Sequence, residues 1–277
     1  MWLGRSSKIR ASASLAPRIP KPRGRGKPRV RLGIALPIAG GRLTVEAARV
    51  AQDLGIDGVF VFDHYVTRSR PGALAGNDPL ALVGALCAST AEVAIGSLVY
   101  RSAAMPVGVS AHAFVTLAKL AGSRLIAGIG IGGRDFELEW REFGDSYPEQ
   151  PARAEMTEKL ADSLIASGVR TWIGGSGASA EEIASRSGAG LNLWGVDIES
   201  FGARAQRLTE RGNEISWAGP WATSSPTGIG EQVLAHQFDS LKSNGASWAV
   251  IAPTGLERAG DIPAAYRRIR KCWLSAA

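Results

Sequence analysis

The sequence has few of the residues from which metal sites and disulfide frameworks are built. Among its 277 residues there are two cysteines, Cys87 and Cys272, and three histidines. Two cysteines so far apart supply neither the ligand spacing of a zinc site nor a disulfide framework. We therefore expect reduced packing residues and no metal. The Walker phosphate-binding pattern is missing too, which argues against a nucleoside triphosphatase.

Long apolar runs are also missing from the sequence. No stretch of about twenty apolar residues occurs, which is the length that a helix needs to cross a bilayer. No apolar segment precedes a small-residue cleavage site, as it would in a secretory signal peptide. We therefore expect a cytoplasmic protein that has no contact with a membrane.

Acidic residues are missing before Glu46, whereas residues 1–31 contain ten lysines and arginines. Removing those ten charges from the net +7 leaves −3 for the remainder, so we expect no nucleic-acid binding. Because this segment is rich in proline and poor in apolar residues, residues 1–30 are predicted to form a disordered basic extension. A transit peptide and a start codon assigned too early are the alternatives.

The rest of the sequence alternates short β-branched or apolar runs with amphipathic stretches, which is typical of βα units and a parallel sheet. Eight strand–helix units are expected, and eight is the number that closes a (β/α)8 TIM barrel. We predict one such domain over residues 31–277, with a doubly wound open sheet as the alternative. The strands are expected at residues 31–36, 58–62, 93–99, 124–130, 170–173, 190–194, 214–217 and 247–252.

Helix boundaries follow from capping residues and prolines. Thr44 is predicted to cap the first helix, Asp78 with Pro79 the second, and Pro106 to open a third. Further helices are expected at residues 152–167, 179–187, 199–211, 230–244 and 262–273, and the long connection 132–151 is expected to form a pocket wall. The strand tryptophans are expected to pack in the core, namely Trp172, Trp194, Trp217 and Trp248.

The dipeptide Asp63-His64 directly follows the second expected strand. In a barrel, polar residues at the carboxyl ends of strands face the active site. Histidine titrates near neutrality and can transfer a proton during hydride transfer, while a neighbouring carboxylate can orient it. The alternative is that Asp63 caps a turn and His64 is a solvated loop residue. His112 and His236 fall within expected helices and are expected to be surface or packing residues.

Two glycine-rich segments also end expected strands. Residues 128–133 lack the spacing and the following helix of the dinucleotide fingerprint, but such glycines let a flat ligand approach the backbone. Residues 172–177 lead directly into a helix, whose unpaired N–H groups suit a phosphate. Compact glycine turns without a ligand are the alternative for both segments.

Taken together, these segments resemble the luciferase-like monooxygenase superfamily, in particular its branch that uses the deazaflavin coenzyme F420. The matching stretches appear in the family's order and cover about residues 31–255. They are residues 32–37, 51–58, 63–64, 78–80, 95–99, 124–132, 172–177 and 248–254.

The resemblance implies a barrel, usually dimeric, that holds an isoalloxazine-like ring in its mouth. His64 would be the proton donor or acceptor near the ring, with Asp63 beside it. Leu98 and Val99 would lie near a non-proline cis peptide that backs the ring. The resemblance assigns further coenzyme contacts to Gly130, Ile131 and Gly132, and phosphate contacts to the backbone of Gly175, Ser176, Gly177 and Ala178.

We therefore expect a homodimeric oxidoreductase that transfers a hydride between F420 and a small organic substrate. An FMN-dependent monooxygenase and a non-catalytic coenzyme-binding barrel are the alternatives. The segment before Trp172 is shorter than in many relatives. Gly133 stands where some sugar-phosphate dehydrogenases of this group have glutamate, which disfavours that substrate class.

Overall fold

The computed structural model describes residues 29–38, 40–65, 76–133, 136–144, 146–222, 229–256 and 258–276. The extension predicted over residues 1–30 therefore lies outside the described residues except for its last two. Val30 is 6% exposed and belongs to the main hydrophobic core, so the packed structure begins slightly before the predicted boundary.

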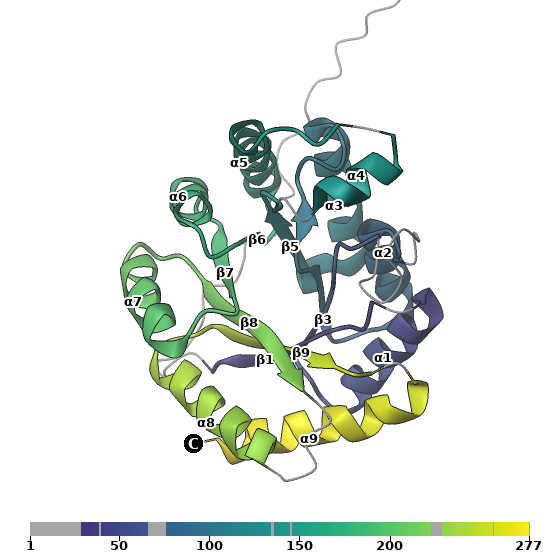
Figure 1. The fold of residues 1–277 in the computed structure, drawn as a ribbon, viewed down its shortest axis with the longest axis vertical. Coiled ribbons are helices and arrows are strands. Elements are labelled where there is room, and N and C mark those ends of the chain that lie inside the picture. The colour runs from purple at the N-terminus through teal and green to yellow at the C-terminus, as the bar shows by residue number, and fades with distance from the viewer. Residues whose placement is uncertain are drawn as a thin grey trace, which may run out of the picture.

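In the part of the chain that the structure describes, nine parallel strands close into a barrel with eight positions around it, which we call staves (Figure 1). Both β3 and β4 pair with β5, so they are two halves of one stave, and β1 pairs with both β2 and β9. The predicted (β/α)8 barrel is confirmed, and the open-sheet alternative is wrong because the last strand pairs with the first. The strands are β1 Arg31–Ala35, β2 Gly58–Val61, β3 Ala94–Ser97, β4 Tyr100–Arg101, β5 Leu125–Gly130, β6 Thr171–Gly174, β7 Gly190–Trp194, β8 Ile215–Ala222 and β9 Trp248–Thr254.

The helices form a ring around these strands, as Figure 1 shows. None of the described helices is both long and apolar enough to cross a membrane. The α-helices are α1 Gly41–Asp53, α2 Pro79–Ser89, α3 Val107–Ala121, α4 Glu137–Glu142, α5 Gln150–Ala166, α6 Ala178–Ser187, α7 Ile198–Thr209, α8 Ile229–Ser243 and α9 Ile262–Ser275. Two 3-10 turns, η1 Gly122–Arg124 and η3 Ala259–Asp261, precede β5 and α9.

Helix capping agrees with the sequence at two of three positions. The Asp78 carboxylate accepts a hydrogen bond of 2.7 Å from the Ala81 N–H and caps α2, and Pro106 precedes α3. The prediction that Thr44 caps α1 is wrong, because the helix begins at Gly41. The Thr44 hydroxyl lies in its first turn and donates to the Pro37 carbonyl.

Three aromatic rings pack together within a buried cluster of the barrel. The ring of Phe60 stacks on that of Trp172 with centroids 5.2 Å apart, and Trp248 meets both rings edge to face. All three side chains are fully buried, so the barrel is a packed core rather than a channel. Ligands are therefore confined to its two ends or its outer surface.

Candidate active site

Asp63 and His64 lie just beyond the carboxyl end of β2, at the rim where barrel enzymes carry their chemistry. The two neighbours differ sharply in exposure. Asp63 is 2% exposed, whereas the side chain of His64 is 38% exposed. Of this pair, the imidazole is the group that a ligand at the rim can reach.

The Asp63 carboxylate is bound to Arg101, at the end of β4. Its Oδ2 accepts from the Arg101 backbone N–H at 2.6 Å and from Nε at 3.0 Å, while Oδ1 accepts from Nη2 at 2.9 Å. The third guanidinium nitrogen, Nη1, donates to Glu139 Oε2 at 2.7 Å. One buried arginine therefore joins two buried carboxylates, and we call Asp63, Arg101, Glu139 and His64 the rim cluster.

The carboxylate nearest to His64 belongs to Glu139. Its Oε1 lies 3.5 Å from His64 Nδ1, whereas the Asp63 side chain is turned to Arg101. The sequence interpretation paired His64 with its neighbour Asp63, and the structure corrects that pairing. Adjacent residues point in different directions as a strand ends, so adjacency in sequence does not imply side-chain contact.

Aromatic rings enclose the cationic member of the rim cluster. The Arg101 guanidinium carbon lies 4.4 Å from the ring centroid of Phe136, 5.0 Å from that of Trp140 and 5.1 Å from that of Tyr65. The Phe136 ring also stacks on the His64 imidazole, with centroids 5.0 Å apart. Guanidinium groups are stabilised over aromatic faces, particularly where water is excluded.

Glu139 and Arg101 are both charged in this environment. Burial alone would raise the pKa of the Glu139 carboxyl, but the hydrogen bond to His64 and the charge of Arg101 outweigh it. The pKa is therefore lowered below 4.5. Burial opposes the charge of Arg101 as well, yet its hydrogen bonds and charge interactions with Asp63 and Glu139 raise its pKa. A neighbouring opposite charge favours the ionised form of each group.

The stave formed by β3 and β4 is interrupted at Leu98–Val99, and this peptide bond is cis, as the resemblance implied. The Val99 methyl groups fill the space beside two glycines, Gly130 of β5 and Gly174 of β6. A Cβ atom added at Gly130 would lie 2.6 Å from Val99 Cγ2, and one added at Gly174 would lie 2.5 Å from Cγ1. These glycines are therefore needed for packing, whether or not a coenzyme approaches Gly130.

The remaining residues of the expected coenzyme wall follow β5. The carbonyls of Ile131 and Gly132 accept hydrogen bonds from the Arg153 guanidinium on α5. Gly132 has a φ of +75°, a conformation that favours glycine. Arg153 thus fixes the backbone just beyond the strand.

Gly175, Ser176, Gly177 and Ala178 form the turn from β6 into α6, as the sequence predicts. Gly177 is the N-cap residue and provides no side-chain cap, and a Cβ added there would meet nothing within 4 Å. Arg204 of α7 donates to the Ser176 carbonyl at 2.6 Å, which brings a guanidinium to this turn. A helix N-terminus beside a cation is suited to a phosphate.

Two aromatic side chains meet across the mouth of the barrel. Phe62 follows β2 and Trp194 ends β7, and these staves are opposite each other in the closed sheet. Their ring centroids are 5.6 Å apart, in edge-to-face geometry. Trp194 is 40% exposed, so the expectation that it packs in the core is wrong. It lies at the rim.

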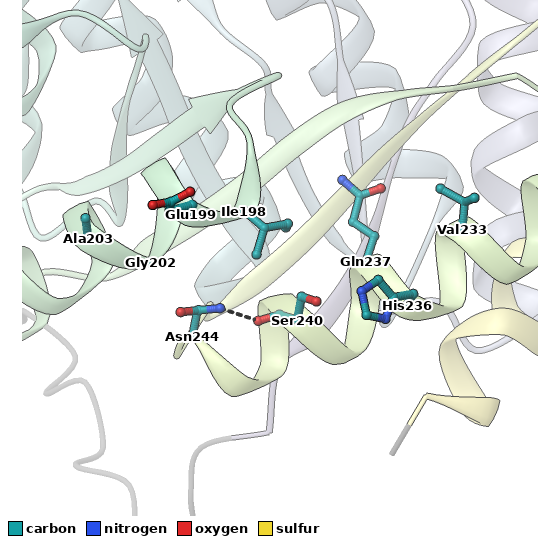
Figure 2. A pocket seen from close by; sticks show the side chains of 9 residues that line it. All are labelled: Ile198, Glu199, Gly202, Ala203, Val233, His236, Gln237, Ser240 and Asn244. Atoms are coloured by element: carbon teal, nitrogen blue, oxygen red, sulfur yellow. Dashed lines mark hydrogen bonds between the residues drawn. The ribbon is translucent and has the colours of Figure 1, made fainter.

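The larger of the two pockets described lies away from this rim. It is a groove of about 610 Å³ between α7 and α8 on the outer wall, and Figure 2 shows His236 among its lining residues. His236 is an exposed helix residue, as predicted. The smaller pocket, of about 320 Å³, is lined by Tyr65, Trp140 and Phe143 and borders the rim cluster. Pocket size therefore does not identify the site, whereas the charged rim cluster does.

Sequence reasoning missed Arg101 and Glu139. Arg101 follows the third expected strand by two residues, so its position at a strand end was an available signal. Glu139 lies in the long connection 132–151, where α4 forms. That connection was expected to be a pocket wall, and Glu139 and Phe136 do border His64.

The comparisons with known proteins agree with this fold. Residues 28–161 match the family model for luciferase-like monooxygenases. A curated relative, the F420-dependent glucose-6-phosphate dehydrogenase of Amycolatopsis mediterranei (strain U-32), is 34% identical over 133 residues. The match covers 45% of this chain and only 38% of that relative.

Solved structures extend the likeness in fold to most of the chain. An F420-dependent secondary alcohol dehydrogenase in complex with an F420-acetone adduct has a TM-score of 0.70 at 13% identity, covering 88% of this chain and 99% of that one. EDTA monooxygenase from Chelativorans sp. BNC1 has a TM-score of 0.67 at 12% identity, covering 89% and 94%. At such identities these structures support the fold alone.

The described chain is a closed α/β barrel, and its candidate site, the rim cluster, lies at the carboxyl rim. The family match over residues 28–161, just under half of the chain, agrees with the resemblance to luciferase-like monooxygenases that the motifs predicted.

Proposed function

We propose that this protein is an oxidoreductase that uses F420 to transfer a hydride to or from a small organic substrate. The observation that carries the proposal is the accessible His64 imidazole at the rim, held beside the ionised Glu139. Histidine can give or take the proton that accompanies a hydride transfer at neutral pH. The similarity to an F420-dependent glucose-6-phosphate dehydrogenase over 133 residues supports this choice of coenzyme.

The residues present fit a flat ring that carries a phosphate-bearing side chain. The cis peptide at Leu98–Val99 supplies a wall, and the half-exposed Trp194 supplies an aromatic surface at the mouth. The turn at Ser176, with the Arg204 guanidinium beside it, would hold a phosphate. F420, when bound, would supply the hydride-accepting or hydride-donating ring carbon. His64 would hold or move the proton. Phe62 and Trp194 would exclude water from the side of the ring that faces the barrel interior.

Titration of the purified protein with F420 and with FMN tests the coenzyme. We expect saturable binding of F420 and weak or no binding of FMN. Tight FMN binding without a response to F420 would contradict the proposal. It would favour an FMN-dependent monooxygenase, and this chain shares its fold with one monooxygenase, that for EDTA.

The variant His64→Ala tests the catalytic role. We expect turnover to fall by about a hundredfold or more while coenzyme binding is retained, because a general acid–base group accelerates the chemical step and not the binding step. His236→Ala is the matched control, since that histidine lies on the outer wall (Figure 2). Coenzyme binding without turnover in the wild type, across a panel of alcohols and carbonyl compounds, would favour a non-catalytic binding barrel.

The homodimer stays a prediction, as does the cytoplasmic location. Sedimentation equilibrium of the purified protein measures the mass in solution. A mass near twice the 29.1 kDa of the chain is expected.

A further inference from the structure

We propose that Glu139 is a positioning residue that holds His64 in a single tautomer, with the proton on Nδ1 and the lone pair on Nε2. The inference deepens the proposed function. It rests on that function only for the role of Nε2 as proton acceptor. The geometry of the rim cluster carries it.

The two oxygens of the Glu139 carboxylate have separate partners. Oε2 accepts from Arg101 Nη1 at 2.7 Å and lies 3.4 Å from the Tyr65 backbone nitrogen, which also donates to it. Oε1 lies 3.5 Å from His64 Nδ1. Because Arg101 is itself held by three hydrogen bonds to Asp63, the Glu139 carboxylate is oriented before any ligand binds.

An ionised carboxylate only accepts hydrogen bonds. Glu139 is 4% exposed, and its lowered pKa keeps it ionised at neutral pH. The nitrogen that faces it must therefore be the donor, which places the imidazole proton on Nδ1. A neutral histidine carries one ring proton, so Nε2 is then an acceptor.

The orientation of the ring is held as well as its tautomer. Phe136 stacks on one face of the imidazole at 5.0 Å with an interplanar angle of 27°. Phe136 immediately precedes α4, and Glu139 lies on that helix, so one short segment supplies both contacts. Trp140, the next residue, is 8% exposed and lies against Arg101, which anchors the segment to the rim.

The nitrogen left for a ligand is Nε2. Within the part of the chain that the structure describes, no hydrogen bond engages it, and the His64 side chain is 38% exposed. In the proposed reaction, Nε2 would accept the proton of a substrate hydroxyl as the hydride leaves the same carbon for the coenzyme, and would return it in the reverse direction. A histidine with its proton on Nε2 could not accept that proton there.

The test is the tautomer itself, measured by ¹⁵N chemical shifts of the imidazole without coenzyme. His112→Gln and His236→Gln, both at exposed helix positions, leave His64 as the single histidine. At alkaline pH we expect an Nδ1–H spectrum in this background. Glu139→Gln is expected to lose the preference, and Glu137→Gln, on the exposed side of α4 and paired with Arg141, is the matched control that keeps it.

An Nε2–H spectrum in the background protein would overturn the inference, and so would an unchanged tautomer in a folded Glu139→Gln variant. If that variant does not fold, the spectrum of the background protein still decides. Turnover separates this inference from the proposed function. We expect Glu139→Gln to lower kcat by about tenfold to a hundredfold with little change in KM, since positioning acts on the proton-transfer step. An Nδ1–H spectrum without any turnover would contradict the proposed function and leave the tautomer assignment standing.

Discussion

At the scale of single residues, the rim is organised around the charge of Arg101. The guanidinium is 1% exposed and is shared between Asp63 and Glu139. Removing charges from water is costly, and only close hydrogen-bonded partners offset that cost. The two carboxylates therefore depend on one cation. Loss of that cation removes the guanidinium hydrogen bonds of both buried carboxylates.

Replacing Arg101 with methionine is expected to lower the free energy of unfolding by about 3 to 5 kcal/mol, which is typical of a broken buried ion pair. Urea denaturation of the purified variant measures the change. Arg141→Met is the control, because Arg141 is 67% exposed in its pair with Glu137 and such pairs contribute less than about 1 kcal/mol. Equal losses in the two variants would show that the Arg101 charge is not needed for folding.

The lowered pKa of Glu139 predicts how stability depends on pH. Its folded-state pKa lies below the ordinary value of 4.5, so between the two values the unfolded chain binds more protons. This contribution is fully present above pH 4.5 and is lost as the pH falls through the folded-state pKa. The difference in free energy of unfolding between wild type and Glu139→Gln should be constant above pH 4.5 and should shrink below it. Urea titrations across this range measure it, and a difference that does not change with pH would contradict the assignment.

The sequence predicted where the exposed His64 imidazole lies but not which residue holds it. The position of His64 follows from a general property of barrels, since strand ends converge at one rim. Its pairing with Glu139 depends on α4, a six-residue helix inside a connection with no clear periodicity. Contacts between residues 75 positions apart arise from packing, which the local pattern does not encode.

At the scale of elements, the broken stave is the feature that shapes the wall. Between β3 and β4, Val99 projects its methyl groups toward β5 and β6, the next two strands of the sheet. Strand positions facing it have no room for a side chain. The sequence pattern identified the glycines but offered ligand approach or a compact turn as the reason for them. It did not predict packing against Val99, because an absent side chain looks the same in each case.

The variant Gly174→Ala tests this packing. Its new methyl group would overlap Val99 Cγ1, and overpacking of this kind costs about 1 to 3 kcal/mol. Thermal or urea unfolding should show that loss, and Val99→Ala in the same chain should restore much of it. Gly108→Ala is the control, because a Cβ there meets nothing within 4 Å and alanine is the better helix former. Additive effects of the two substitutions at positions 99 and 174 would refute the contact.

At the scale of the whole molecule, the alternation of strands and helices was sufficient to predict the architecture. All eight staves fall where apolar runs were found, and β8 alone extends well past its predicted end, to Ala222. The start of α1 was misplaced because Gly40 has no capping side chain that a sequence pattern would detect.

Among the described residues, the strand pairing that closes the barrel begins at Arg31, the first residue of β1. A chain that begins at residue 29, and so keeps the buried Val30, is expected to unfold at the same temperature as the full chain. Differential scanning calorimetry makes the comparison. A drop of more than about 4 °C, on the order of 1 kcal/mol for a chain of this size, would show that residues 1–28 stabilise the barrel.

The pairing of β1 with β9 also sets the order of events during synthesis. Arg31 lies opposite Trp248 in the closed sheet. One edge of β1 therefore stays unpaired until β9 has been synthesised and can bind to it. An exposed strand edge can pair with another chain. On the ribosome, the nascent protein must therefore carry an open edge until β9 has emerged. Chaperone demand should therefore persist until synthesis is nearly complete, because β9 lies close to the end of the 277-residue chain.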